Sequence, residues 1–185
     1  MTEEPISKLE KRTLAYLGTG KEASEAQLGL VRRAIEDVKR LSRPMFATAF
    51  YSIKDCPIRL EFSSLQKLFE LGESDSVCII ISTIGPAIDA RMEVLNQRGD
   101  YSKSLLIDAA ANAYVEHVTD EYQKSLNLKN PTFRFAPGYG DVPLELQREI
   151  FDNVPGSDKT GVKLDDNYLM HPWKSMTGII GFKGE

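Results

Sequence analysis

The run from Val77 to Ile81 constrains the possible folds of this chain more than any other segment. It reads Val-Cys-Ile-Ile-Ile, and its neighbours Ser76 and Ser82 are small and polar. So short a run favours a strand over a helix, and its β-branched residues favour the same structure. A strand that is apolar at every position is covered on both faces. The sequence therefore predicts a central strand over residues 76–82, with Cys78 buried inside the core.

Hydrophobic periodicity elsewhere predicts both helices and strands, without an internal repeat, a low-complexity tract or a long linker. Helices are expected over residues 6–17, 22–41, 63–71, 86–98, 101–126 and 143–154. Strands are expected over residues 45–53, 58–62, 132–136, 162–164 and 175–182. The simplest architecture is one α+β domain over residues 1–185, with long helices packed on a mixed or antiparallel sheet. Residues 44–185 would form its core, and residues 1–43 an N-terminal helical layer that covers the sheet or serves as a partner-binding arm.

Composition excludes several classes of protein. The net charge of -4, the pI near 5.4 and the lack of a basic block are unlike a nucleic-acid-binding protein. No apolar segment reaches the length of a membrane span, and the acidic N-terminus, Met1 to Pro5, is unlike a secretory signal. Cys56 and Cys78 share no metal-ligand spacing with the two histidines. The expectation is a reduced, cytoplasmic protein without a metal site.

The segment from Arg134 to Asp141, Arg-Phe-Ala-Pro-Gly-Tyr-Gly-Asp, is the first candidate for a binding loop. Its two glycines leave main-chain amides uncovered, and its proline stiffens the entry. The planar guanidinium of Arg134 suits a carboxylate or a phosphate. The loop could therefore hold a small polar ligand against bare backbone, with Tyr139 beside it. From composition alone, a surface turn with a solvated arginine is the alternative.

The long helix expected from Tyr101 has an unusually small centre, Ala-Ala-Ala-Asn-Ala over residues 109–113. Asp108, Asn112 and Glu116 recur every four residues, so they form one polar stripe on that helix. Small residues allow a ligand or another backbone to approach closely. The stripe is therefore either one wall of a polar pocket or a solvated face.

The chain carries no recognisable catalytic apparatus of its own. It has no nucleophile elbow, phosphate loop, dinucleotide fingerprint or defensible Ser–His–Asp pattern. Two histidines offer little general acid–base capacity. Its adjacent carboxylate pairs do not face a common point on a helix. Binding is therefore expected in place of catalysis by side chains, and no catalytic residue is assigned.

Three segments taken together resemble the activation, or reactivation, domain of cobalamin-dependent methionine synthase, in its short free-standing form. The first runs from Ile81 to Gly85 and on through the helix that carries Asp108 and Glu116. The second covers residues 134–145 and the third residues 161–178. Their order and spacing match over roughly the last hundred residues, which is more specific than any single motif. The N-terminal helices resemble the short relatives only weakly.

The resemblance implies a role in the repair of an oxidised corrinoid cofactor. Cobalamin enzymes of this kind occasionally lose an electron from the cob(I) state and stall as cob(II). The activation domain holds S-adenosylmethionine over the corrin, a flavodoxin-like protein or a ferredoxin supplies an electron, and the methyl group restores methylcobalamin. The domain then supplies position and electrostatics while the cofactors carry the chemistry. The chain would be an accessory subunit of methionine synthase or of a related corrinoid methyltransferase, with cobalamin carried by its partner.

The family's ligand loop falls on Arg134, Ala136, Gly138 and Tyr139. The resemblance implies that Arg134 clamps the methionyl carboxylate of S-adenosylmethionine. The main chain at Ala136 and Gly138 would hydrogen-bond the ligand, and Tyr139 would face the corrin of the partner. Asp108 matches a carboxylate that the family turns towards the histidine released from cobalt, so it is also expected to face the partner.

The chain departs from the long members of the family at three places. It has Asn112 where they usually carry an acidic residue that helps hold the ligand's ammonium, and Glu116, one turn on, is the candidate to replace it. After Tyr139 it continues with Gly-Asp-Val-Pro in place of Pro-Ala-Cys-Pro. It stops at Glu185, before an aromatic segment that touches the ligand in the long members.

Three functions therefore stay open. The first is a separate subunit that binds S-adenosylmethionine and docks on a corrinoid protein to reactivate it. The second is a docking or assembly subunit of a corrinoid methyltransferase that has kept the fold and lost the ligand. The third is a self-standing methyltransferase acting on a small substrate, for which the sequence shows no evident base.

Overall fold

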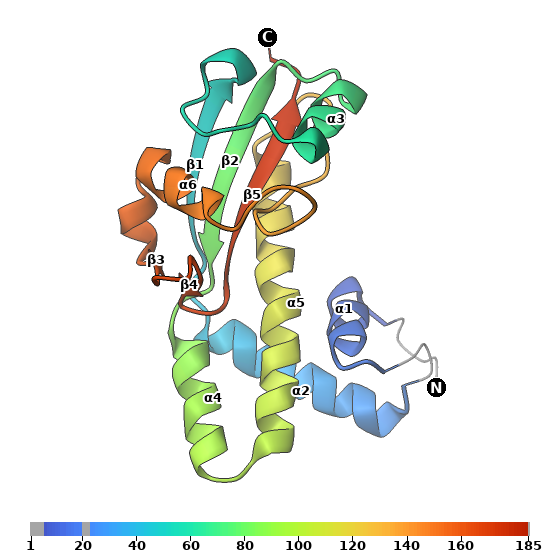
Figure 1. The fold of residues 1–185 in the computed structure, drawn as a ribbon. Coiled ribbons are helices and arrows are strands. Elements are labelled where there is room, and N and C mark those ends of the chain that lie inside the picture. The colour runs from blue at the N-terminus through green and yellow to red at the C-terminus, as the bar shows by residue number, and fades with distance from the viewer. Residues whose placement is uncertain (1–5, 20–22, 185) are drawn as a thin grey trace.

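A three-stranded antiparallel sheet lies at the centre of the fold (Figure 1). The structure, a computed structural model, describes residues 6–19 and 23–184. Strand β2 (Ser76–Thr83) lies between β1 (Met45–Ser52) and β5 (Ser175–Phe182) and pairs with both in antiparallel register. Residues 77–83 of β2 are buried, which confirms the central strand predicted from its apolar run.

Six α-helices accompany the sheet within residues 6–19 and 23–184. They are α1 (Lys8–Tyr16), α2 (Glu25–Leu41), α3 (Ser63–Leu71), α4 (Ala87–Gln97), α5 (Tyr101–Ser125) and α6 (Leu146–Asn153). The remaining elements are the short 3-10 helices η1 (Ile53–Asp55) and η2 (Ser157–Thr160), and a hairpin of β3 (Lys163–Leu164) and β4 (Met170–His171). The predicted α+β class is confirmed. No described helix is both long enough and apolar enough to cross a membrane.

Alternate side chains of β2 face two different helical coverings. Ile79 and Ile81 pack with residues of α3 and α6 in one cluster. Cys78 and Ile80 pack on the other side with Ile180 of β5 and the C-terminal end of α5. This division follows from the two-residue period of a strand. Because helices cover both faces, an apolar side chain is needed at every position of the run.

Helix α5 continues beyond the sheet and forms the axis of a second, purely helical layer (Figure 1). Its N-terminal half packs with α1, α2 and α4 around buried residues such as Val38, Ile88 and Ile107. Helix α1 begins with a capping box between Ser7 and Glu10, and α2 begins with a second box of the same kind. The N-terminal helices therefore lie against α5 and not on the sheet.

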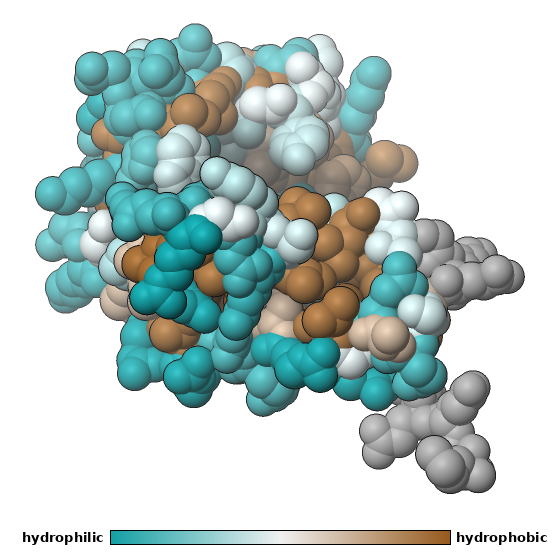
Figure 2. Space-filling model, turned by 90° about the horizontal axis from the view of Figure 1, so that it is seen from below, coloured by the Kyte–Doolittle hydropathy of each residue, from teal (hydrophilic) through white to brown (hydrophobic). Residues whose placement is uncertain are grey.

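The lower end of this helical layer carries an apolar patch among hydrophilic residues (Figure 2). A groove of about 640 Å³ lies between α2 and the N-terminal end of α5. Leu30 and Leu106 contribute apolar surface to its lining, and Arg33 and Lys103 contribute positive charge. The described lining of this groove comes from α2, α5 and the α5 cap, and not from the loop of residues 134–141.

The strand predicted over residues 58–62 is wrong, because this segment joins no sheet. Ile58 and Leu60 are buried in the cluster beneath α3 and α6. The main-chain N–H of Arg59 donates to the Glu149 carboxylate of α6 at 2.9 Å. The apolar alternation in this segment therefore reflects packing against a helix and not pairing in a ladder.

The strand predicted over residues 132–136 is also wrong, although the segment follows the edge of β5. It forms one isolated bridge, between Phe135 and Ile179, and one further main-chain bond from Thr132 to Gly181. The helix predicted over residues 143–154 begins only at Leu146, and β4 lies in a segment expected to be a loop.

Asp141, the last residue of the candidate loop, caps the start of α3. Its carboxylate accepts hydrogen bonds from the main-chain N–H groups of Ser63 and Ser64, at 2.7 and 3.1 Å. These hydrogen bonds hold the pKa of Asp141 below its usual value. The capping position is Phe62, and its own side chain makes no such bond. The helix is capped instead by Asp141, 77 positions after Ser64, and this contact connects the loop to the helix.

Replacing Asp141 with alanine should remove this cap and lower the thermal unfolding midpoint by about 2–4 °C. Scanning calorimetry or circular dichroism would measure the midpoint. Asp166→Ala, which removes an exposed carboxylate from the β3–β4 turn, is the matched control and should leave the midpoint unchanged. Equal midpoints for Asp141→Ala and wild type would show that the cap contributes nothing to stability.

Candidate functional site

A hollow of about 310 Å³ lies between α5, the segment of residues 133–139 and β5. Its lining residues are Glu116, Phe133, Arg134, Phe135, Ala136, Tyr139, Met176 and Thr177. The structure thus brings together four of the residues singled out in the sequence, Arg134, Ala136, Tyr139 and Glu116. They come from two segments that lie at opposite sides of the hollow.

Gly138 sets the course of the loop and does not line the hollow. Its φ of +91° is in the region that favours glycine, and its N–H donates to the carbonyl of Val142 at 2.9 Å. Gly140, with a φ of +58°, lies against the side chain of Ser64 in α3. These two glycines let the loop turn sharply and fold back onto α3, which leaves Tyr139 69% exposed.

Arg134 turns inward from the loop and lies across β5. A Cβ atom at Gly178 would overlap the aliphatic part of the Arg134 side chain, so a residue without a side chain is needed there. The guanidinium donates to Gln123 Oε1 at 2.8 Å and to Asp120 Oδ1 at 3.0 Å, both on α5. Only 12% of the side chain is exposed. Arg134 is therefore held by the protein itself while it also forms part of the wall of the hollow.

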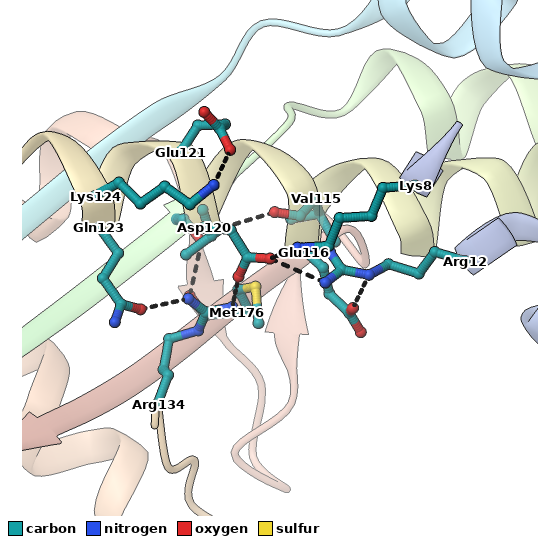
Figure 3. Close-up of polar contacts among 12 residues, drawn as sticks. Lys8, Arg12, Val115, Glu116, Asp120, Glu121, Gln123, Lys124, Arg134 and Met176 are labelled. Carbon is teal, nitrogen blue, oxygen red and sulfur yellow. Dashed lines mark hydrogen bonds and ion pairs between the residues drawn. The ribbon is translucent and has the colours of Figure 1, made fainter. Parts of the chain in front are cut away.

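The N-terminal helix α1 supplies a second arginine to the same region (Figure 3). Arg12 places Nε 3.2 Å from Glu116 Oε2, and its terminal nitrogen donates to Asp120 Oδ2 at 2.9 Å. The hydroxyl of Tyr16 donates to the other oxygen of Glu116. Arg12 and Tyr16 are four residues apart, so they share one face of α1, and that face meets the polar stripe of α5.

Charge and burial shift two pKa values in this cluster. Burial raises the pKa of Asp120, but hydrogen bonds from Arg12 and Arg134 outweigh it, so the pKa lies below its usual value. Burial and, next, the hydrogen bond to Glu116 raise the pKa of Tyr16 to about 12. At neutral pH the Asp120 carboxyl is therefore ionised, and the Tyr16 hydroxyl is a neutral donor.

Asp108 and Asn112 lie in a separate polar cluster further along α5. Lys174, at the start of β5, places Nζ 2.6 Å from Asp108 Oδ1 and donates to Asn112 Oδ1 at 2.8 Å. Asn112 Nδ2 donates to Asp108 Oδ2 at 3.2 Å. Asn112, expected to contact a ligand, is therefore not among the residues that line the hollow. Asp108 keeps 40% of its side chain exposed, which leaves its carboxylate accessible to a partner.

Several contributors to these clusters have no assigned role in the sequence, among them Arg12, Tyr16, Asp120, Gln123 and Lys174. Asp120 could have been found, because it extends the spacing of Asp108, Asn112 and Glu116 by another four residues. The partners of Arg12 and Lys174 are distant in sequence, and no local pattern indicates them.

Replacing Asp120 with asparagine should lower the free energy of unfolding at pH 7 by about 1–2 kcal/mol, because two arginines lose a charged acceptor. The pKa of Asp120 is lowered in the folded state, so its contribution is complete above the unfolded value and is lost as pH falls through the folded one. The difference between wild type and variant should therefore shrink below about pH 4. Urea titrations between pH 3 and pH 7 would measure it.

Asp152→Asn, at an exposed position of α6, is the matched control and should show no such pH-dependent difference. A constant difference across this pH range would mean that asparagine at position 120 acts through packing and not through charge.

No protein-family model matches this chain, and no curated protein sequence matches it. Its fold is similar to that of a solved structure described as "Crystal Structure of the MetH Reactivation Domain bound to AdoHcy". The match has a TM-score of 0.57 and 16% sequence identity, and covers 94% of this chain and 75% of the other. The sequence resemblance to a methionine synthase reactivation domain is thus confirmed at the level of the fold, and this chain has the fold of the MetH reactivation domain.

Proposed function

We propose that this chain binds S-adenosylmethionine in the hollow beside Arg134 and works with a corrinoid protein in a methionine synthase context. The observation that carries the proposal is the meeting of Arg134, Ala136, Tyr139 and Glu116 around one hollow, in a fold shared with a reactivation domain described as bound to AdoHcy. The sequence resemblance assigns Arg134 and Ala136 to the ligand and Tyr139 to the corrin, and Glu116 is its candidate to replace an acidic residue. Fold and residue positions therefore support the same site.

The chemistry of the hollow suits the amino-acid end of such a ligand. Arg134 has five N–H donors, and the protein engages two of them, so others remain for a carboxylate. Glu116 places a carboxylate in the lining, where Arg12 and Tyr16 of α1 already contact it. A volume of about 310 Å³ lies at the lower end of the range of small-molecule sites, about 300–1,000 Å³. Phe133, Phe135 and Met176 supply apolar surface for the remainder of the ligand.

The same end of the molecule offers surface for a partner that carries cobalamin. Tyr139 is 69% exposed beside the hollow and can present its ring to a flat macrocycle. We further propose that S-adenosylmethionine donates its methyl group to cobalamin held by that partner. A flavodoxin-like or ferredoxin reductant supplies the electron that reduces cob(II)alamin before the methyl transfer. This chain positions the reactants without acid–base chemistry of its own.

One observation favours a second function, that of a docking or assembly subunit without a ligand. Arg134 already has Asp120 and Gln123 as partners, so the loop has a structural role that needs no ligand. In that function the exposed Tyr139 and Asp108 would belong to a protein interface. Ligand binding distinguishes the two functions.

Isothermal titration calorimetry of the full chain should show saturable binding of S-adenosylmethionine. Arg134→Gln should weaken it at least tenfold, because a charge-assisted clamp on a carboxylate is lost. Arg148→Gln, at an exposed position of α6, removes the same charge and should bind as wild type does. No heat at millimolar ligand with folded wild-type protein would reject the ligand site and favour the docking subunit.

The corrinoid role has a separate test. A corrinoid module of methionine synthase, oxidised to cob(II)alamin, should regain the absorption spectrum of methylcobalamin when this chain, S-adenosylmethionine and a reductant are added together. Tyr139→Ala should slow that recovery while leaving the thermal unfolding midpoint unchanged, because the ring is largely exposed. Recovery that is equally fast without this chain would remove the proposed role.

A further inference from the structure

Helix α1 controls the charge of the hollow, because its side chains hold the carboxylate that a ligand's ammonium would need. Both oxygens of Glu116 have partners from α1, Oε2 with Arg12 and Oε1 with the Tyr16 hydroxyl. Figure 3 shows Arg12 reaching from α1 between Glu116 and Asp120, on the same side of α5 as Arg134.

Arg12 is held in this position by a well-anchored helix. Thr13 is fully buried and Leu14 is 7% exposed, and both lie in the core that α1 shares with α2 and α5. Glu10, one turn before Leu14, forms an ion pair of 2.6 Å with Arg32 of α2. The side chain of Arg12 is itself only 25% exposed. The contact with Glu116 is therefore a fixed part of the fold and not a chance meeting of solvated charges.

The consequence for a ligand follows from the sum of the charges. Glu116 and Asp120 carry two negative charges. Arg12 and Arg134 carry two positive charges, and the ammonium of Lys8 adds a third at 3.9 Å from Asp120. A ligand ammonium at Glu116 would find the carboxylate already matched and a guanidinium 3.2 Å from one of its oxygens. Like charges at such range repel, most strongly where solvent is partly excluded. A ligand carboxylate at Arg134 meets the Asp120 carboxylate in turn, but this cost is the same for a ligand with the ammonium and for one without it.

We propose that Arg12 is a specificity-determining residue of this hollow, because its guanidinium occupies the Glu116 carboxylate in the place of a ligand's ammonium group. It thereby weakens binding of nucleosides that carry an amino-acid ammonium, relative to the same nucleosides without it. This inference rests on the proposed function, since it concerns the site in which S-adenosylmethionine is proposed to bind.

The test uses two ligands and the full chain. S-adenosylhomocysteine carries both carboxylate and ammonium, and its deaminated analogue keeps the carboxylate and lacks the ammonium. Arg12→Gln should raise the affinity for the first, relative to the second, by about tenfold, as measured by isothermal titration calorimetry. Lys11→Gln removes the same charge from an exposed position of the same helix and should leave that ratio at its wild-type value. Circular dichroism would establish that both variants are folded.

Each other outcome is decisive. If wild type binds S-adenosylhomocysteine and Arg12→Gln leaves the ratio unchanged or lowers it, this inference is overturned and the proposed ligand site stands. If neither wild type nor Arg12→Gln binds either nucleoside at millimolar concentration, the ligand site and this inference are both rejected. If Lys11→Gln raises the ratio as much as Arg12→Gln, the effect belongs to the net charge of α1 and the assignment to Arg12 is wrong.

Discussion

The packing of α5 against two different layers is the constraint on which the rest of the structure depends. Its C-terminal end covers one face of the sheet, where Cys78 and Ile80 lie, and its N-terminal half joins α1, α2 and α4. At 1.5 Å per residue, its 25 residues extend about 38 Å. The alanines at its centre are buried, so neighbouring elements approach its backbone closely. The polar stripe on its surface carries both polar clusters.

The two polar clusters join elements that come from distant parts of the sequence. Asp120 connects α1, α5 and the loop that follows Asn130, because arginines from both sides share its carboxylate. Lys174 connects the start of β5 to α5 in the same way. Such partly buried charges have few alternative partners, so each one specifies how its element is placed as well as stabilising it. The hollow lies where the first of these clusters meets the sheet, and ion pairs hold two of its lining residues, Glu116 and Arg134.

Local pattern was enough to predict the parts of the fold whose side chains decide their own structure. The central strand β2, the small centre of α5 and the α+β class all follow from short segments. Residues 58–62 resemble a strand because Ile58 and Leu60 are buried against helices. Residues 132–136 resemble one because the segment follows the edge of β5, to which it is joined by one isolated bridge. The candidate loop was found from composition and resemblance. Two contacts of Asp120 depend on tertiary packing that no local pattern encodes. They are its hydrogen bond with Arg134 and its hydrogen bond with Arg12, which lies 108 residues away in the sequence.

The absence of a side chain at Gly178 couples the choice of residue in β5 to the choice of residue at position 134 of the loop. The Arg134 side chain lies where any larger residue at 178 would place its first carbon. A mutation that adds a side chain at position 178 would displace the Arg134 side chain from the surface of β5. A mutation of Arg134 to a smaller residue would leave the main chain at Gly178 uncovered. The two positions are thus expected to change together in evolution, so that an alignment of related chains would show glycine at one wherever arginine is kept at the other.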